Sequence, residues 1–182
     1  MELLKQVDSG RWLCIARLEK FDVESLPYEP EERRRFKPFE TLELVGNLLV
    51  TGAVSGTGGG VNGMWDRLIG NTTVPAYSAA NARIGVGDGN GSVPTPANGD
   101  TDLTAPTNKL RKAMAGAYPT APTARGVSFQ SDFTTGEANF VWNEWGVFNT
   151  ATAAQGMLNH KGENLGTKAS GTWTLTVTIS IT

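Results

Sequence analysis

The sequence predicts a mainly β protein: an antiparallel β-sandwich or barrel with glycine-rich turns, little helix and an N-terminal charged arm or hairpin. Residues 172–182 alternate apolar and hydroxyl side chains with a period of two, which is the pattern of a strand with one buried face. All but two of the 22 glycines follow residue 50, in clusters typical of turns. Half of the 16 Lys and Arg residues precede residue 44, so charge is concentrated near the N-terminus.

The N-terminal region, residues 1–45, contains one apolar, partly alternating segment and the start of a second, and both are typical of strands. They are RWLCIARLEKF at 11–21 and ETLELVGNLLV at 40–50. Residues 22–39 between them contain three prolines and mixed charge, which favours an exposed arm that docks onto a neighbour. The composition changes near Gly46, and residues 46–182 are the predicted β-rich structural domain.

The arm holds the most concentrated positive charge of the chain, at Arg33, Arg34 and Arg35. Such a run is one signature of a nucleic-acid contact. Three glutamates between residues 29 and 32 adjoin it and cancel its charge, which favours a solvated or subunit-contacting segment. We therefore predict Arg33, Arg34, Arg35 and Phe36 as subunit-interface residues.

A glycine run after residue 50 contains Gly58, Gly60 and Gly63 in the G-x-G-x-x-G spacing of dinucleotide-binding loops. That reading also requires a long crossover helix, a second parallel strand and an acidic residue about 20 positions on. The following MWDRLIGNTTVP allows less than two helical turns before Gly70. A flexible glycine loop is the favoured interpretation.

A second glycine cluster, IGVGDGNG at 84–91, suggests a phosphate loop, a metal loop or a tight bend. A phosphate loop needs a lysine after the last glycine, and none is present. Asp88 and Asn90 match the first two ligands of a calcium loop, but the third ligand and the closing glutamate are missing. We interpret the segment as a strand end and bend whose glycines accept positive φ, and we predict no metal and no cofactor.

The C-terminal half contains the clearest strand signals. GVSFQSDFT at 126–134, NFVWNEWGVFN at 139–149 and TWTLTVTISIT at 172–182 are predicted strands. TTGEAN, NTATAAQG and KGENLGTKASG separate them as predicted turns. Strands and turns at this spacing indicate antiparallel pairing.

Candidate catalytic residues are few. Cys14 is the single cysteine and sits in an apolar segment, where a buried structural thiol is expected. His160, the single histidine, lies in a predicted turn and is expected at the surface. Glu137 and Glu144 resemble a glycosidase pair only in residue type. We predict no catalytic residue.

Trp142 and Trp145 suggest a platform for stacking sugars. They lie three positions apart, so on a regular strand they face opposite sides and cannot form one flat surface unless a bulge intervenes. Core packing is the favoured interpretation.

The net charge and hydropathy of the chain limit the classes of partner that we expect. A net charge of −2 gives no general attraction for nucleic acid or anionic membranes. The N-terminus lacks the pattern of a secretory signal, and no segment approaches the length of a membrane span. We expect synthesis and assembly in a cytosol, with no membrane and no specific nucleic-acid partner.

Several motifs together resemble a group of virion structural proteins of tailed bacteriophages. The resemblance covers residues 46–182 and rests on GNLLVTGAVSGTGGGVNGMWDRLIGN, NARIGVGDGNG and FTTGEANFVWNEWGVFNTATAAQGMLNHKGENLGTKASGTWTLTVTIS, in that order. The arm at 22–39 is longer and more charged than that resemblance leads us to expect.

The resemblance implies a non-enzymatic protein that is located in the virion and assembled in the cytoplasm of the bacterial host. Within that class we expect a capsid decoration, or cement, protein that binds the major capsid protein and copies of itself, as a homotrimer, and stabilises the head. A tail, neck, baseplate or fibre component is the alternative within the class. A carbohydrate-binding or glycan-cleaving module, and a nucleotide-binding enzyme, are the alternatives outside it.

Overall fold

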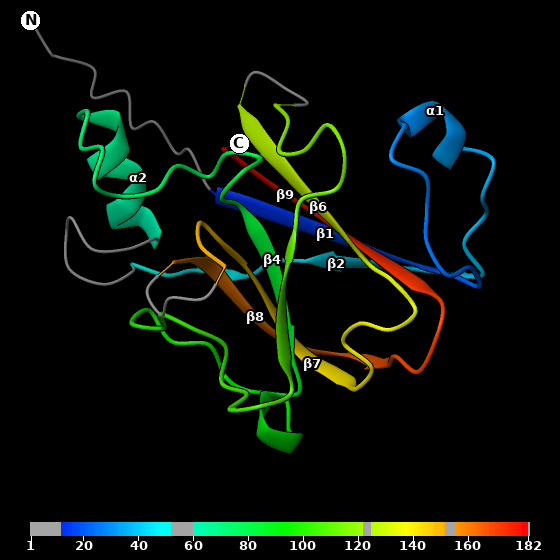
Figure 1. Cartoon of the computed structure of the whole chain (residues 1–182). Helices are drawn as coiled ribbons and strands as arrows, with labels where there is room; N and C mark the ends of the chain where they lie inside the picture. The colour runs from blue at the N-terminus through cyan, green and yellow to red at the C-terminus, as the bar shows by residue number, and fades with distance from the viewer. Residues whose placement is uncertain (1–11, 52–59, 122–124, 152–155, 182) are drawn as a thin grey trace, which may run out of the picture.

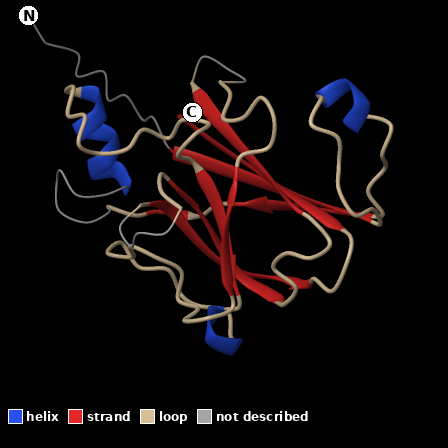
Figure 2. Cartoon of the chain, in the orientation of Figure 1, coloured by secondary structure: helices blue, strands red, loops and turns tan. Residues whose placement is uncertain are grey.

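Two antiparallel sheets pack face to face, so the predicted mainly β sandwich is confirmed (Figures 1 and 2). The computed structural model describes residues 12–51, 60–121, 125–151 and 156–181. Its strands are β1 (Trp12–Phe21), β2 (Glu40–Val45), β3 (Leu48–Leu49), β4 (Arg83–Gly87), β5 (Lys109–Ala113), β6 (Gly126–Phe133), β7 (Val141–Phe148), β8 (Met157–Thr167) and β9 (Thr172–Ile181). The helices are α1 (Pro30–Arg33), α2 (Gly60–Leu68) and the 3-10 turn η1 (Gly89–Gly91).

The first sheet has four strands in the order β2-β1-β9-β6. Its strand β9 was predicted from the alternation in residues 172–182, and the structure confirms it. Trp173, Leu175, Val177 and Ile179 are buried against the other sheet. The intervening hydroxyl side chains therefore lie on the outer face of the four-stranded sheet.

Polar side chains pair across β6 and β9 on this outer face. Hydrogen bonds join Ser128 to Thr178 at 2.5 Å, Gln130 to Thr176 at 2.8 Å and Thr174 to Asp132 at 2.7 Å. These are the directly opposite residues in the register of the two strands. Since a slip by one residue would exchange the two faces of β9, the three pairs and the buried apolar row specify the same register.

The second sheet has five strands in the order β3-β8-β7-β4-β5. Its central strand β7 supplies Trp142 and Trp145 to the core between the sheets, and neither side chain is exposed to solvent. The Trp142 ring packs edge-on against Phe133 and Trp173, with ring centroids 4.8 and 4.9 Å apart. This aromatic contact joins the two sheets, because Phe133 and Trp173 belong to β6 and β9.

The composition change near Gly46 does not separate two cores. β1 pairs with β2 on one side and with β9 on the other, so residues of the N-terminal region and of the C-terminal strand form one sheet. Cys14, Ala16 and Leu18 of β1 belong to the same buried cluster as the core residues of the five-stranded sheet.

Helix α2 begins inside the segment for which we predicted a flexible glycine loop, and that prediction is wrong for residues 60–63, whereas residues 64–68 form the short helical stretch that the sequence allowed. Gly58 lies outside the described residues, whereas Gly60 and Gly63 are buried on one side of the helix. Backbone N–H groups of Val61 and Asn62 donate to the carbonyls of Val50 and Thr51, which satisfies donors that a helix start leaves unpaired.

Strand β8 includes KGENLGT, which we predicted as part of a turn. That prediction is wrong because strand pairing outweighs the weak β preference of glycine, lysine and glutamate. β8 lies between β3 and β7, so both of its edges are partly or wholly paired. Neither of the described helices is long and apolar enough to cross a membrane.

Candidate functional site

The most concentrated polar chemistry in the described part of the chain lies on the outer face of the five-stranded sheet. It surrounds Glu144 of β7, whose neighbours Trp145 and Val147 turn into the core. The Glu144 carboxylate is fully buried. It accepts hydrogen bonds of 2.8 Å from the backbone N–H groups of Thr104 and Ala105, in the long connection between η1 and β5. That connection, residues 92–108, therefore packs onto this face.

Glycines on both neighbouring strands make room for this contact. In the sheet register, Glu144 lies between Gly87 of β4 and Gly162 of β8. A Cβ atom at Gly87 would lie 2.7 Å from Oε1 of Glu144, and one at Gly162 would lie 1.9 Å from the carbonyl oxygen of Pro94. Only glycine at these two positions leaves space for the carboxylate and for the loop above it.

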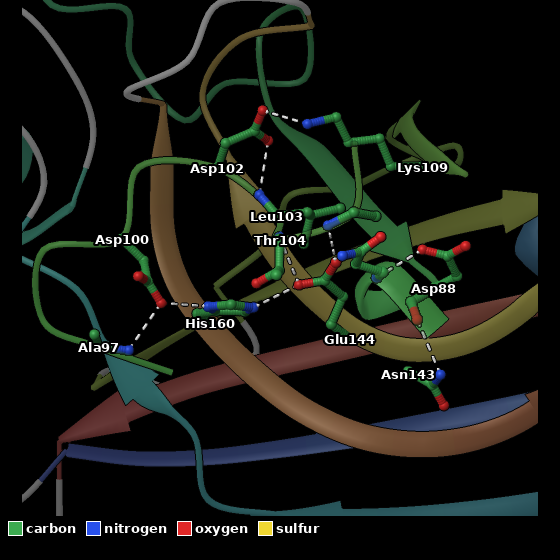
Figure 3. Close-up of polar contacts among 12 residues, drawn as sticks. Asp88, Ala97, Asp100, Asp102, Leu103, Thr104, Lys109, Asn143, Glu144 and His160 are labelled. Atoms are coloured by element: carbon green, nitrogen blue, oxygen red, sulfur yellow. Dashed lines mark hydrogen bonds and ion pairs between the residues drawn. The ribbon is translucent and has the colours of Figure 1, made fainter. Parts of the chain in front are cut away.

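His160 of β8 completes a cluster of three charged side chains (Figure 3). Its Nε2 lies 2.9 Å from Oε2 of Glu144, and its Nδ1 lies 2.6 Å from Oδ2 of Asp100 in the loop. Asp100 also accepts a 2.8 Å hydrogen bond from the backbone N–H of Ala97. The imidazole is only 1% exposed, so the prediction of a surface histidine in a turn is wrong.

The geometry favours the doubly protonated, positively charged imidazole. Burial alone lowers the pKa of His160, but hydrogen bonds to Glu144 and Asp100 and the charges of these carboxylates raise it above its ordinary value. Burial alone raises the pKa of Glu144, but its bonds to His160, Thr104 and Ala105 bring it below the usual value. Both ring nitrogens donate to a carboxylate in this state, and the cluster carries one net negative charge.

Two further contacts hold the same loop to the sheet. Asp102 accepts hydrogen bonds of 2.7 Å from Lys109 and from Arg111 of β5. Burial raises the pKa of Asp102, but these two cations hold it below its usual range. Asp88 accepts from the backbone N–H of Asn90 and from the side chain of Asn108.

This arrangement fastens the loop at residues 92–108 to the five-stranded sheet. Both nitrogens of His160 are occupied by carboxylates, and among the described residues no hydroxyl or thiol is recorded in contact with the ring. Among the residues that the structure describes, no group of three His, Cys, Asp or Glu side chains is placed to hold a metal ion. Cys14 is buried, and burial raises the pKa of its thiol to about 12.

The other carboxylate that we considered, Glu137, lies elsewhere. It occupies the turn between β6 and β7, pairs with Lys112, and accepts hydrogen bonds from the backbone and hydroxyl of Thr134. Burial raises the pKa of Glu137, but the bond to Lys112 keeps it below its ordinary value. Glu137 and Glu144 have separate sets of partners and do not form a pair across a cleft.

Trp142 and Trp145 are both buried, as the core interpretation predicts, but they do not face opposite sides. The register of β7 on β8 shifts between Trp142 and Glu144, where the single residue 143 of β7 lies opposite residues 163–165 of β8, so the regular alternation is interrupted. Both indoles therefore enter the core between the sheets. These two residues offer no exposed platform for a sugar.

The glycine cluster at 84–91 ends β4 and turns the chain, as predicted. Gly89, Asn90 and Gly91 all have positive φ angles, of 61°, 57° and 83°. The Asp88 side chain stabilises this turn by accepting from Asn90. Its two carboxylate oxygens accept hydrogen bonds, one from the backbone N–H of Asn90 and one from the side-chain amide of Asn108.

The arm at residues 22–39 leaves the end of β1, carries α1 and returns to the start of β2 (Figure 1). Of the four predicted interface residues, Arg33 forms its ion pair with a residue of the same chain. Its guanidinium forms a two-pronged ion pair with Asp132 of β6 and lies 3.5 Å from the hydroxyl of Thr174. The hydrogen bond to Asp132 is the main cause of the raised pKa of Arg33. Arg34, Arg35 and Phe36 are exposed.

A groove of about 480 Å³ lies between the arm and the outer face of the four-stranded sheet. Its lining includes Arg17, Arg33, Arg34, Tyr118 and Gln130. The arm is thus held over the sheet at Arg33.

We expect Asp132→Asn to loosen this arm. A hydrogen bond to a charged group contributes about 1.5–3 kcal/mol, so its weakening should raise the rate of tryptic cleavage after Arg34 and Arg35 about tenfold or more. Limited proteolysis followed by mass spectrometry measures the rate. Glu31→Gln, which removes only the exposed pair between Glu31 and Arg34, is the control and should leave the rate unchanged. Equal rates in both variants would show that the Arg33 contact does not hold the arm.

Comparison of the chain with protein-family models, with curated proteins and with solved structures found no match.

Proposed function

We propose that this protein is a non-enzymatic structural component of a tailed-phage virion, and within that class a capsid decoration protein. The motif resemblance over residues 46–182 supports the virion class. The observation that carries the proposal is the arm. It is an exposed, charged segment between β1 and β2, and the ion pair between Arg33 and Asp132 holds it to the β-sandwich. Such an element suits a protein that acts by contacting neighbours.

The use of the reactive side chains also supports a structural role. His160 and Glu144 are sealed beneath a loop, Glu137 is paired with Lys112, and Cys14 is buried. These groups stabilise the fold in their observed positions. The carbohydrate alternative draws no support from the residues that suggested it, because Trp142 and Trp145 lie in the core.

The proposed partners are the major capsid protein and further copies of this chain. A protein that binds only the assembled shell stabilises that shell by mass action, by about 2.7 kcal/mol per site when its free concentration is a hundred times its Kd. Heads that lack the protein should therefore lose their DNA at a lower temperature.

Gold-labelled antibodies against the purified chain, applied to phage particles from the source of the gene, test this proposal. We expect label distributed over the head. Label confined to the neck, tail or tail tip would replace decoration by the alternative virion role. Particles without label would overturn the virion proposal, and a glycan array would then test the carbohydrate alternative.

A further inference from the structure

The arm carries its charges in two blocks of opposite sign. Glu29, Glu31 and Glu32 form an acidic block at the start of α1 and within it, and Arg34, Arg35 and Lys37 form a basic block after the helix ends. Arg33, between the blocks, is turned inward to Asp132. The two blocks therefore follow each other along one exposed segment.

Most of these charges have no partner in the described part of the chain. The six side chains belong to exposed residues. Only Glu31 and Arg34 pair with each other, at 3.0 Å and with both side chains at least 75% exposed. An exposed pair of this kind contributes little, about 0–1 kcal/mol. Within the described residues, no ion pair is recorded for Glu29, Glu32, Arg35 or Lys37.

Exposed aromatic side chains accompany the charged blocks. Tyr28 is 70% exposed, Phe39 is 66% exposed and Phe36 is 37% exposed. Three large aromatic residues on one short exposed segment indicate a contact surface, since aromatic side chains are enriched where proteins bind each other. They supply the apolar area that exposed ion pairs alone lack.

The arm is also fixed in position before any partner binds. Arg33 anchors its middle, and the backbone N–H of Phe39 donates a 2.9 Å hydrogen bond to the carbonyl of Lys20 at its base. A segment that is already ordered loses less conformational entropy on binding. The charged blocks are thus presented in a defined order.

We infer that the arm is a self-association surface, on which the acidic block of one copy pairs with the basic block of a second copy. Like blocks repel each other, so two arms can meet only with opposite blocks in register. In both a two-fold dimer and a closed ring of three copies, every acidic block pairs with a basic block of another copy. This inference rests on the proposed function for its purpose, since a shell component needs contacts between copies.

Charge reversal in the full-length chain tests the inference without any phage particle. The acidic-block variant is Glu29→Lys with Glu31→Lys and Glu32→Lys. The basic-block variant is Arg34→Glu with Arg35→Glu and Lys37→Glu. Arg33 is kept in both, so the anchor to Asp132 remains. Arg67→Glu with Arg125→Glu, two exposed charges outside the arm, is the control.

Sedimentation velocity measures association of each chain alone and of the variants mixed. We expect the unchanged chain and the control to associate, less at high salt than at low salt. Each block variant alone should associate more than about tenfold more weakly, and an equimolar mixture of the two should regain association. A monomeric unchanged chain, or a mixture that stays monomeric, would overturn the inference. Either result leaves the location of the protein in the particle to the gold-labelling experiment.

Discussion

His160→Leu lowers the free energy of unfolding by about 3–5 kcal/mol between pH 4.5 and 6.5. The substitution removes both N–H donors, and it leaves the fully buried carboxylate of Glu144 without its charged partner. The cost of breaking a buried ion pair is the cost of that uncompensated charge. Urea denaturation, followed by tryptophan fluorescence, measures the difference.

Two further variants distinguish the stability contributed by the His160–Glu144 pair from the general effect of substituting a residue in β8. Lys161→Met changes the next residue of β8, a partly exposed lysine, and should cost less than about 1 kcal/mol. The double variant His160→Leu with Glu144→Gln should cost less than the sum of its two single variants, because each single change already breaks the same pair. Additive costs would show that His160 and Glu144 act independently.

The cluster also predicts how stability depends on pH. The pKa of His160 is raised above 6.5 in the folded state, so its contribution is full below pH 6.5 and is lost as pH rises through the folded value. The pKa of Glu144 is lowered below 4.5, so its contribution is full above pH 4.5 and is lost as pH falls through the folded value. Stability should therefore decline on both sides of this window. In His160→Leu the alkaline decline that His160 causes should be absent, and its persistence would contradict the assignment.

Gly162→Ala is expected to lower the free energy of unfolding by about 3 kcal/mol. The added methyl carbon would lie 1.9 Å from the carbonyl oxygen of Pro94, a backbone atom that can move only if the loop lifts from the sheet. Lifting the loop strains the bonds from Thr104 and Ala105 to Glu144. Urea denaturation of the variant gives the cost.

Gly99→Ala is the matched control, because it makes the same chemical change in the loop that packs over Gly162. A Cβ atom at Gly99 meets nothing within 4 Å, so this variant should match the unchanged chain within about 0.5 kcal/mol. Equal stability of the Gly162→Ala and Gly99→Ala variants would contradict the close packing of the loop on β8. In a chain that already carries His160→Leu, Gly162→Ala should lower the free energy of unfolding by less than it does alone, since both substitutions release the loop at residues 92–108.

Sequence periodicity was sufficient where a strand has one apolar face and one polar face. β9 meets that condition, and so does β6, whose Phe129 and Phe133 face the core. The turn at Gly89, Asn90 and Gly91 was also predictable, because positive φ angles favour these residue types. The conformation of these two strands and of this turn follows from the side chains of their own residues.

The sealed cluster was not predictable from local pattern. β8 contains Asn159, His160, Lys161 and Gly162 in succession, which carries no apolar alternation and has the composition of a turn. The strand forms because β7 and β3 pair with it. The histidine is buried because residues 92–108 cover it, and Asp100 is 60 positions away along the chain. A glycine in a strand often indicates a close backbone approach, and Gly87 at the end of β4 gave that signal. Gly162 did not, because its segment has the composition of a turn.

Irregular pairing of β7 with β8 explains the error about the two tryptophans. Strict alternation places Trp142 and Trp145 on opposite faces, whereas the register shift between Trp142 and Glu144 interrupts the alternation and both side chains enter the core. The sequence alone does not mark the position of this irregularity. It follows from pairing with β8.

The strand order β2-β1-β9-β6 has a consequence for synthesis on the ribosome. β9 lies between β1 and β6, yet it is the last of the four to be translated. At about 5–20 residues per second, β1 waits on the order of ten seconds for its central partner. During that interval the core-facing side of the β1–β2 hairpin has no completed sheet around it, which makes the nascent chain a natural client for chaperones. Premature termination anywhere before Thr172 would leave β1 and β6 without the strand that joins them.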